Sequence, residues 1–495
     1  MRSVDQRQLT FVFVDNPKPG SRDAIASGVL EAKAWLRQIA KAKGTYRSTA
    51  RVTPDSKGLL EQVAARPNLA ESLLNVARNK GAAGVDRISI QDVLLNVRAL
   101  LDKLHHALLT DRYRPGDIRR VWIPKPNGGQ RGLGIPNVID RWVQEATRLI
   151  LEPLFEPHFH VSSHGFRPKR GAQTAVAQAK GFIEAGFTTV VDLDISKFFD
   201  RVHHQRLLNR LAQRVCDGRV LQLIHRLLKA RVVLEDGVII KVDKGTPQGG
   251  PLSPLLSNIV LDELDWQLDR RGLHFVRYAD DVSIFVHSQR SGERVMSSTC
   301  RFIETRLRLE INEAKSSVTT PDKIHFLGFC FRKNRTGGYE VHLSSLSDQR
   351  INRRIRELTP RKWGQSLSRC IAELNQYLRG WDDYFGRICT KMGVSRFKAY
   401  DSHIRRRLRM IIIRQRGRPR YLYRHLKACG VPGGSAYRAA YCQRGLWFKS
   451  SRRGINMAYG ISWFESRVYT LWLQWQRKHP GPLMAPGGQF LLFAL

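Results

Sequence analysis

The sequence predicts an α+β fold of more than one domain, in which a mixed region precedes a helical and strongly basic one. Short β-branched runs, some ending in carboxylates, alternate with amphipathic helical segments over the first two thirds of the chain. From about residue 345 onwards the apolar spacing is helical, and basic residues are abundant. A chain of 495 residues is long enough for roughly two to four domains.

The charge balance predicts a polyanionic partner. The chain has 83 Lys and Arg against 43 Asp and Glu, which gives a formal net charge of +40. This excess is larger than solubility requires and indicates many contacts to phosphate groups. A membrane surface is a weaker alternative, because the sequence has no basic amphipathic anchor, no hydrophobic signal core at its N-terminus and no apolar run of transmembrane length.

The seven cysteines are scattered, and no two of them form a Cys-x-x-Cys pair. This spacing gives no support to a zinc ribbon or a dithiol redox motif, and it is typical of a reducing cytosol. We therefore expect a cytoplasmic protein that is not attached to a membrane. No feature of the sequence points to a protein partner.

The N-terminal part is expected to be an extension followed by a globular region. Residues 1–56 are polar and uneven, with one helix predicted near residues 24–42. A globular pattern begins at residue 57, and Asn68 is a candidate N-cap of the next helix.

Residues 119–136 predict a hairpin around an Asn-Gly-Gly turn. Lys125 and Arg131 flank this turn, so both cations can project to one side. They could grip a triphosphate, or they could be ordinary charges at a strand edge. Their spacing alone does not decide between the two.

A helix is predicted over residues 140–154, stopped by Pro153 and Pro157. A basic loop follows at residues 162–168. Three histidines lie close to it, and contacts within the loop or to RNA are favoured over a metal site because no further ligands are nearby. These are His158, His160 and His164.

Residues 190–194 form a short β-branched run that ends in acids. Strand periodicity places Asp192 and Asp194 on the same face, with Asp194 nearer the end, where a metal and a substrate can approach. For Asp192 and Asp200 a structural hydrogen-bonding role is favoured.

Two connectors follow this strand. Residues 231–240 predict a hairpin with an Asp-Gly turn. Residues 245–254 contain three glycines and three prolines, which predicts a constrained loop whose backbone can approach a ligand, and this loop opens a helix that runs through Asp265. Gln248 in the loop could contact the templating base or the incoming sugar, or the loop could be a simple connector.

Residues 278–281 (Tyr-Ala-Asp-Asp) place two carboxylates between two β-rich runs, which predicts a tight hairpin with acids at its tip. An adjacent acid pair taken alone favours a solvated turn, so a metal site requires a second acidic strand end. Asp194 supplies one. Two acidic strand tips that converge through a sheet predict a phosphoryl-transfer site with two Mg²⁺ ions, bound by Asp194 and Asp280.

The last part of the chain contains Lys315 after a helix, a strand predicted at residues 324–329, and then basic helices. Residues 401–430 are rich in Arg, with interleaved tyrosines, which is typical of a nucleic-acid backbone binder. The candidate RNA-binding residues are Arg379, Arg405, Arg406, Arg407, Arg409 and Arg414. The tryptophans of residues 431–495 are expected to form a small core rather than to stack on bases.

With these motifs in order, residues 65–450 resemble the reverse transcriptases encoded by bacterial group II introns, the intron maturases. Residues 278–281 resemble the active-site turn of that family, and residues 194–200 (Asp-Ile-Ser-Lys-Phe-Phe-Asp) are similar to its first metal motif. Residues 245–254 match its Pro-Gln-Gly loop. Residues 374–385 (Leu-Asn-Gln-Tyr-Leu-Arg-Gly-Trp-Asp-Asp-Tyr-Phe) look like the signature of the maturase thumb.

The resemblance implies a right-hand polymerase. Its parts would be fingers at 57–187, an α+β palm at 188–338, a thumb and maturase domain at 339–425, and a small DNA-binding region at 426–495. It also implies roles for individual residues. Catalysis would use Asp194, Asp280 and Asp281, metal binding Asp194, Ile195 and Asp280, and deoxynucleotide binding Lys125, Arg131, Phe199, Gln248 and Lys315, with Phe199 excluding a ribose 2′-hydroxyl.

The Asp382-Asp383 pair in the thumb signature is a poor metal site, because adjacent residues on a helix point about 100° apart. The paired zinc cysteines of an HNH endonuclease are also missing, so a type without that endonuclease is expected.

The expected function is RNA-directed DNA synthesis on group II intron RNA together with assistance to intron splicing. Further expected partners are target DNA and deoxynucleoside triphosphates, with Mg²⁺ as the cofactor and a bacterial, nucleoid-associated location. Two alternatives stay open: an RNA-binding splicing cofactor whose polymerase is vestigial, and a domesticated defence or repair reverse transcriptase.

Overall fold

The computed structural model describes residues 22–41, 58–124, 129–360, 364, 366–389 and 395–478. Contacts divide the chain into two compact units. The first comprises residues 1–171, 191–284 and 290–318, and the second comprises residues 172–190, 285–289 and 319–495. None of the described helices is long and apolar enough to cross a membrane.

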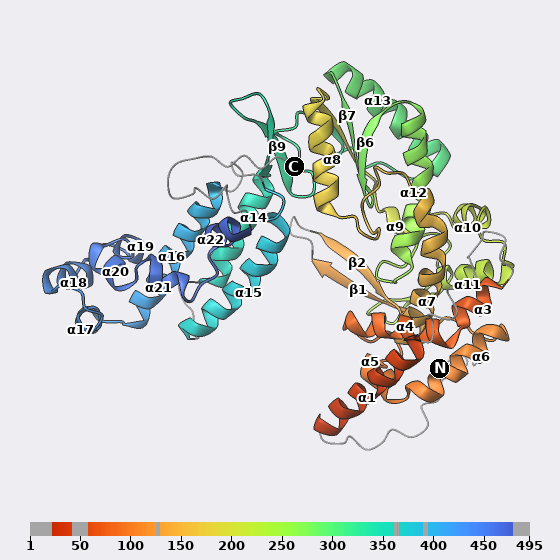
Figure 1. Cartoon of the computed structure of the whole chain (residues 1–495), viewed down its shortest axis with the longest axis horizontal. Coiled ribbons are helices and arrows are strands. Elements are labelled where there is room, and N and C mark those ends of the chain that lie inside the picture. The colour runs from red at the N-terminus through yellow and green to blue at the C-terminus, as the bar shows by residue number, and fades with distance from the viewer. Residues whose placement is uncertain are drawn as a thin grey trace, which may run out of the picture. The chain divides into compact units, whose positions relative to one another are not determined.

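The first unit combines helices with one four-stranded sheet and with most residues of a second one (Figure 1). Its helices are α1 (Arg22–Lys41), α3 (Leu59–Ala64), α4 (Arg66–Arg78), α5 (Ile90–Leu95), α6 (Val97–Leu109), α7 (Val138–Phe155), η1 (Glu156–His158), α9 (Phe198–Arg201), α10 (His204–Ala212), α11 (Gly218–Leu228), α12 (Ser253–Arg270), α13 (Gln289–Phe302) and the π-helical turn η2 (Ile303–Leu307). The α+β class predicted from the sequence is confirmed.

The first sheet has the order β2-β1-β4-β5. Its strands are β1 (Ile118–Pro124), β2 (Gln130–Ile135), β4 (Val232–Val233) and β5 (Ile239–Ile240). Strand β1 pairs antiparallel with β2 and parallel with β4, and β4 pairs antiparallel with β5. Both predicted hairpins therefore form, although residues 125–128 of the first turn, including Lys125, lie outside the described residues.

The second sheet carries the acidic motifs and has the order β6-β7-β3-β8. Its strands are β3 (Thr189–Asp194), β6 (His274–Tyr278), β7 (Asp281–Val286) and β8 (Ser317–Thr319). Every residue of β7 after Asp281 is buried, as expected for a strand inside a sheet. Helix α12 packs against β6.

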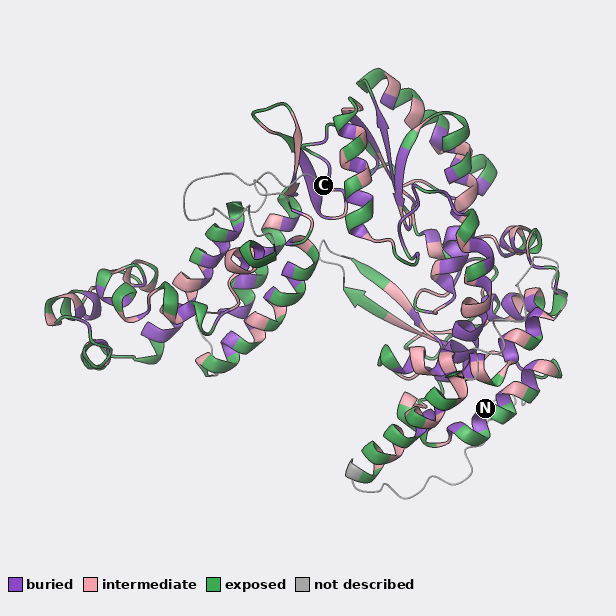
Figure 2. Cartoon of the chain, in the orientation of Figure 1, coloured by how far each residue is buried: buried purple, intermediate pink, exposed green. Residues whose placement is uncertain are grey.

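The core of the first unit lies between α4 and α7, which are largely buried in Figure 2. Trp142 is fully buried and donates a hydrogen bond from Nε1 to the carbonyl of Leu69 at 2.7 Å. Asn68 is not the predicted N-cap. It lies inside α4, is buried, and donates to the carbonyl of Ala146 at 3.0 Å, because a buried amide between two packed helices needs such a partner.

The helix predicted over residues 140–154 forms as α7, but Pro153 does not stop it, because α7 continues to Phe155. The last-turn residues Leu154 and Phe155 are buried, and this packing offsets the hydrogen bond that a proline removes. Of the three histidines near the basic loop, His160 and His164 are buried, and His160 makes a predicted contact within the loop by accepting a hydrogen bond from the amide of Ser162 at 3.1 Å.

The second unit contains α8 (Ala172–Glu184), a two-stranded antiparallel sheet and the basic helical region. Its other elements are β9 (Phe329–Lys333), β10 (Tyr339–Leu343), α14 (Ser345–Leu358), α15 (Leu367–Phe385), α16 (Ser395–Gln415), α17 (Pro419–Ala428), α18 (Gly433–Ala440), α19 (Leu446–Lys449), α20 (Arg453–Ala458), α21 (Ile461–Glu465) and α22 (Leu471–Lys478).

The strand predicted at residues 324–329 is wrong, because β9 begins only at Phe329. Leu327 and Gly328 both have left-handed backbones, with φ of 51° and 90°, and they form a tight turn that is closed by mutual backbone hydrogen bonds of Phe326 and Phe329. The apolar residues of this segment belong to a turn rather than to a strand.

Candidate active site

The acidic turn joins β6 to β7 through Ala279 and Asp280. Ala279 has a φ of +59°, a left-handed conformation that residues other than glycine rarely adopt. Strand β3 lies next to β7 in the sheet, and Ser283 of β7 donates a hydrogen bond to Asp192 of β3 at 3.0 Å. This register brings the end of β3, where Asp194 stands, to the start of β7. Asp192 has the hydrogen-bonding role expected of it.

The acids at these strand ends repel one another. The pKa of Asp280 is raised, mainly by burial and then by the charge of Asp194. The pKa of Asp281 is raised to about 7; desolvation by the surrounding protein is the largest cause, although part of the residue reaches solvent, and Asp280, Asp192 and Asp194 add repulsion. Burial likewise raises the pKa of Asp192 to about 6. Burial and mutual repulsion therefore both disfavour the ionised forms of these acids.

Two of the predicted nucleotide-binding cations lie at this cluster. Lys315 Nζ is 3.3 Å from Asp194 Oδ2, which also accepts a hydrogen bond from Asn312 Nδ2 at 2.9 Å. Lys315 opposes the rise in the pKa of Asp281, and Arg131 does the same for Asp280. Both cations are therefore close enough to act on the acids electrostatically.

The donor set fits divalent cations such as Mg²⁺, which prefer carboxylate and carbonyl oxygens, and Ile195 could contribute only its main-chain oxygen. Within the described residues, however, no three His, Cys, Asp or Glu side chains are gathered closely enough to hold a metal ion. The carboxylates of Asp194, Asp280 and Asp281 affect one another's pKa, but they are not close enough together to form a complete metal-coordination site.

The glycine- and proline-rich loop packs against both β2 and α9. Gln248 accepts a hydrogen bond from Arg131 Nε at 3.2 Å, and its own carbonyl accepts one from the amide of Gly134 at 2.8 Å. A Cβ on Gly249 would lie 2.5 Å from the carbonyl oxygen of Gly134, so this approach requires glycine. The structure thus brings together the predicted residues Arg131 and Gln248.

The other end of the same loop holds Phe199. The amide of Thr246 donates to the carbonyl of Phe199 at 2.6 Å, and that of Gly245 donates to the carbonyl of Val202 at 2.7 Å. Phe199 lines a cavity of about 370 Å³ together with Trp122 of β1. Asp200 is not in the acidic cluster; it lies 3.6 Å from Arg120 in an ion pair.

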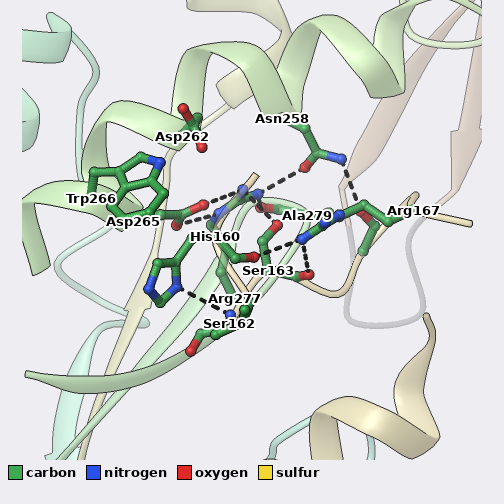
Figure 3. Close-up of polar contacts among 12 residues, drawn as sticks. His160, Ser162, Ser163, Arg167, Asn258, Asp262, Asp265, Trp266, Arg277 and Ala279 are labelled. Carbon is green, nitrogen blue, oxygen red and sulfur yellow. Dashed lines mark hydrogen bonds and ion pairs between the residues drawn. The ribbon is translucent and has the colours of Figure 1, made fainter. Parts of the chain in front are cut away.

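Arg277, directly before the acidic turn, is a residue that the motif analysis missed (Figure 3). It is fully buried, and its five N–H groups are all used. Nε and Nη2 donate to the carboxylate of Asp265 at 2.7 and 2.6 Å, and Nη1 donates to Asn258 Oδ1 and to the carbonyl of Ala279 at 2.9 Å each. The second hydrogen of Nη2 goes to Ser163 Oγ at 2.7 Å.

This network fixes the left-handed residue of the acidic turn. Arg277 grips the Ala279 carbonyl, while Asn258 also donates to the carbonyl of Gly165 at 3.0 Å. A Cβ on Gly165 would lie 2.3 Å from the amide nitrogen of Ala279, so the two backbones are in direct contact. The sequence signals that could have revealed this network are a single arginine in an apolar strand, Arg277, and an aspartate on the apolar side of a helix, Asp265.

The candidate RNA-binding arginines of the second unit divide into two groups. Arg406 donates to the carbonyl of Trp447, Arg407 to Thr359, and Arg409 to the carbonyl of Tyr459, so these three stabilise the unit itself. Burial lowers the pKa of Arg409 to about 10. Arg379 and Arg414 are exposed, and Arg405 is partly exposed, in the same class as the first three.

Asp382 and Asp383 lie on the helix α15, as expected when the sequence identified this pair as a poor metal site. Asp382 is fully buried and pairs with Lys478 Nζ at 2.6 Å and Tyr469 Oη at 2.7 Å. Of the C-terminal tryptophans, Trp475 is buried and stacks on Trp472, in line with the small core expected there.

Comparison with known proteins agrees with this geometry. Residues 123–331 match the family described as reverse transcriptase (RNA-dependent DNA polymerase), and residues 348–430 match the group II intron maturase-specific domain. Protein YkfC of Escherichia coli is 31% identical over 342 residues, which cover 61% of this chain and 90% of that protein. The chain belongs to the group II intron reverse transcriptases and maturases. Its enzyme class is RNA-directed DNA polymerase, as predicted.

Other members of this group are longer. The group II intron-encoded protein LtrA of Lactococcus lactis is 32% identical over 303 residues, which cover 48% of this chain and 50% of LtrA. The putative COX1/OXI3 intron 2 protein of Saccharomyces cerevisiae is 29% identical over 287 residues, which cover 46% of this chain and 34% of that protein. The chain thus aligns with half or less of each of these two proteins.

Proposed function

We propose that this reverse transcriptase extends a DNA primer on group II intron RNA by two-metal phosphoryl transfer, during mobility of the intron. One observation carries the proposal: Asp194 ends β3 beside the start of β7, where Asp280 and Asp281 stand, and it is near enough to raise the pKa of both. The ionised form of such a cluster is stabilised by positive charge, which metal ions that also bind a nucleotide can supply.

In this proposal Asp194 and Asp280 hold the Mg²⁺ ions, with the Ile195 carbonyl as a further ligand, and Asp281 assists. When bound, the ions would lower the pKa of the primer 3′-hydroxyl and neutralise charge on the leaving pyrophosphate. Arg131, oriented by Gln248, would hold the triphosphate. Lys315, now 3.3 Å from Asp194, would turn its ammonium towards the same phosphates.

Three parts of the site assignment rest on the motifs alone. Lys125 would join Arg131 at the triphosphate. Phe199, held through its carbonyl by Thr246, would exclude a ribose 2′-hydroxyl. Gln248 would line the nascent base pair.

The maturase-specific domain supports a second activity, assistance to splicing of the intron RNA. The exposed or partly exposed Arg379, Arg405 and Arg414 would contact RNA phosphates there. Target DNA would be the further nucleic-acid partner of the basic second unit.

The Asp280→Asn variant separates these activities. It keeps the shape of the side chain and removes a metal ligand. We expect primer extension on an RNA template with Mg²⁺ to fall at least about a hundredfold, since metal ligation supplies several kcal/mol of charge stabilisation. Splicing of the intron RNA that flanks the gene should persist.

The matched control is Asp383→Asn, which neutralises an exposed acid of the other Asp-Asp pair. It should extend the primer as the unsubstituted protein does. Undiminished extension by Asp280→Asn would refute the site assignment, and loss of splicing by a variant with a normal melting curve would refute the separation of the two activities.

A further inference from the structure

A second cavity of the first unit lies apart from the acidic turn and has a volume of about 620 Å³, within the range of small-molecule sites. Its wall is formed by one face of α12, by the segment from Phe155 to Val161 and by the C-terminal end of α10 with the residues that follow it. Asp262, Trp266 and Arg270 recur every four residues along α12, so they share one face. Arg210 lies on α10, and Arg214 lies just beyond its end. Neither the acids nor the nucleotide-binding residues of the active site line this cavity.

An aromatic platform stands in the wall. Trp266 is 42% exposed although it lies on a helix that is otherwise well buried. Its ring is held from two sides: Nε1 donates to the carbonyl of His158 at 3.3 Å, and the His160 ring meets it edge-on with centroids 5.1 Å apart.

His160 is itself fixed in one orientation. Its Nδ1 accepts a hydrogen bond from the amide of Ser162 at 3.1 Å, so the ring proton must lie on Nε2, which is 3.2 Å from Asp269. The support behind the tryptophan is therefore a neutral imidazole with both nitrogens engaged, and the indole face is held ready for a planar ligand.

A carboxylate oxygen in the same wall lacks a partner. Asp262 Oδ1 is buried and accepts no hydrogen bond from the described residues, and Oδ2 is only loosely approached by Arg210 Nη2 at 3.5 Å. Burial, and then the charge of Asp265, raise the pKa of Asp262 to about 6. A buried acceptor of this kind costs free energy unless a donor fills it. Figure 3 shows Asp262 and Trp266 side by side on their helix.

The remaining charges favour an anion. The wall carries Arg210, Arg214 and Arg270 against Asp262 and Glu263. Glu263 is already held by Arg206, whose Nη2 lies 3.1 Å from its carboxylate. The Arg214 guanidinium makes no hydrogen bond or ion pair with the part of the chain that the structure describes.

We propose that this cavity is a nucleotide-binding site separate from the polymerase site. The base stacks on Trp266, an amino group of the base donates to the carboxylate of Asp262, whose side chain is partly exposed in the cavity wall, and Arg214 and Arg270 hold the phosphate. The site prefers bases that carry an amino group (guanine, adenine and cytosine) over uracil. The nucleotide comes either from solution or from an unpaired position in an RNA strand, because both present the same base and phosphate.

Equilibrium dialysis of the full chain tests this proposal, with labelled GMP, AMP, CMP and UMP and with single-stranded RNA pentamers, all without divalent metal. We expect saturable binding of the amino-bearing bases. Trp266→Ala should weaken it at least about fivefold, because stacking on an aromatic side chain is worth roughly 1–3 kcal/mol per base. Arg214→Ala should weaken it by a similar factor.

Asp262→Asn is the sharpest variant, because it preserves shape and reverses part of the hydrogen-bonding pattern. It should reduce the preference over UMP by about tenfold. Arg301→Ala, an exposed arginine on α13, is the matched control and should bind as the unsubstituted chain does. Asp280→Asn should also bind normally, which distinguishes this site from the polymerase site.

Binding of free monophosphates would assign a soluble nucleotide, and binding of pentamers alone would assign an RNA strand. Either result supports the proposal provided that it depends on Trp266 and Arg214. No saturable binding, or binding unchanged by all three cavity variants when melting curves are normal, would overturn it.

Discussion

The chain contains two Asp-Asp pairs of note, and their surroundings are opposite. Asp280 and Asp281 stand where a hairpin turn enters a strand, next to further acids, and neither makes an ion pair with the described residues. On α15, Asp382 is fully buried with its charge met by Lys478, while Asp383 is 61% exposed. The first pair has no cation from the described part of the chain bound to its carboxylates, whereas the buried carboxylate of the second pair is neutralised by a lysine.

The difference shows that a reactive site is marked by acids whose charge the fold leaves uncompensated, and not by the presence of acids alone. The charge of a buried carboxylate is compensated within the fold when an ammonium and a hydroxyl group donate to it, as Lys478 and Tyr469 do to Asp382. A cluster of acids that raise one another's pKa is stabilised in its ionised form by a ligand that brings positive charge. The acidic turn of the first unit is held in place by Arg277, which is fully buried and paired with Asp265.

Removing that arginine should produce the largest effect. Arg277→Met leaves Asp265 buried without a counter-charge, so we expect a loss of about 3–5 kcal/mol in the free energy of unfolding, measured by urea denaturation. Primer extension should fall as well, because the Ala279 carbonyl loses its donor.

The double variant Asp265→Leu with Arg277→Met should regain most of the stability, because an apolar pair can replace a buried ion pair, but not the extension activity. Arg301→Met on α13 is the control and should stay within about 0.5 kcal/mol. Equal stabilities of the Arg277 and Arg301 variants would contradict the stabilising role of the Arg277 network.

A smaller loss is expected at the neutralised pair. Lys478→Met removes the ammonium from Asp382, whose carboxylate keeps Tyr469 as a donor, so we expect about 1–3 kcal/mol. Arg387→Met, which breaks the exposed pair with Asp383, should cost less than about 0.5 kcal/mol. If these two variants lost the same stability, Asp382 would not be a charge that the core must neutralise.

The smallest effect concerns pH. The folded protein binds a proton at Asp281 with a pKa of about 7, above the unfolded value near 4, so ionisation of this residue weakens the fold as the pH rises from about 4 to 7. Asp281→Asn stays neutral, and without metal it should become more stable than the unsubstituted chain at pH 8 but not at pH 4. Because the residue reaches solvent, the gain should be only a few tenths to about 1 kcal/mol. A stability difference that does not change between these two pH values would contradict the shift.

Much of this could be predicted from the sequence. Period-two spacing placed Asp194 at a strand end, and the acid pair was correctly placed at a hairpin. The corrections arise where packing overrides local preference. Pro153 stays helical because the residues after it are buried, and Asn68 lies inside a helix because it hydrogen-bonds to a neighbouring one.

The Arg277 network and the cavity beside α12 were beyond sequence reasoning for another reason. Arg277 of β6 meets Ser163 in a distant loop and both Asn258 and Asp265 on α12, and no spacing rule links the loop, the helix and the strand. The cavity likewise depends on the meeting of α12, the end of α10 and the segment from Phe155 to Val161. A set of contacts between distant segments leaves no periodicity to detect.

The contact between Gly165 and Ala279 has a consequence for altering this enzyme. Because a side chain at position 165 would press on the amide of Ala279, mutational libraries that vary the turn alone will sample only conformations that the distant loop permits. A library meant to reshape the turn must vary the loop of residues 162–168 at the same time, so that the unit of engineering is the pair of segments rather than the motif.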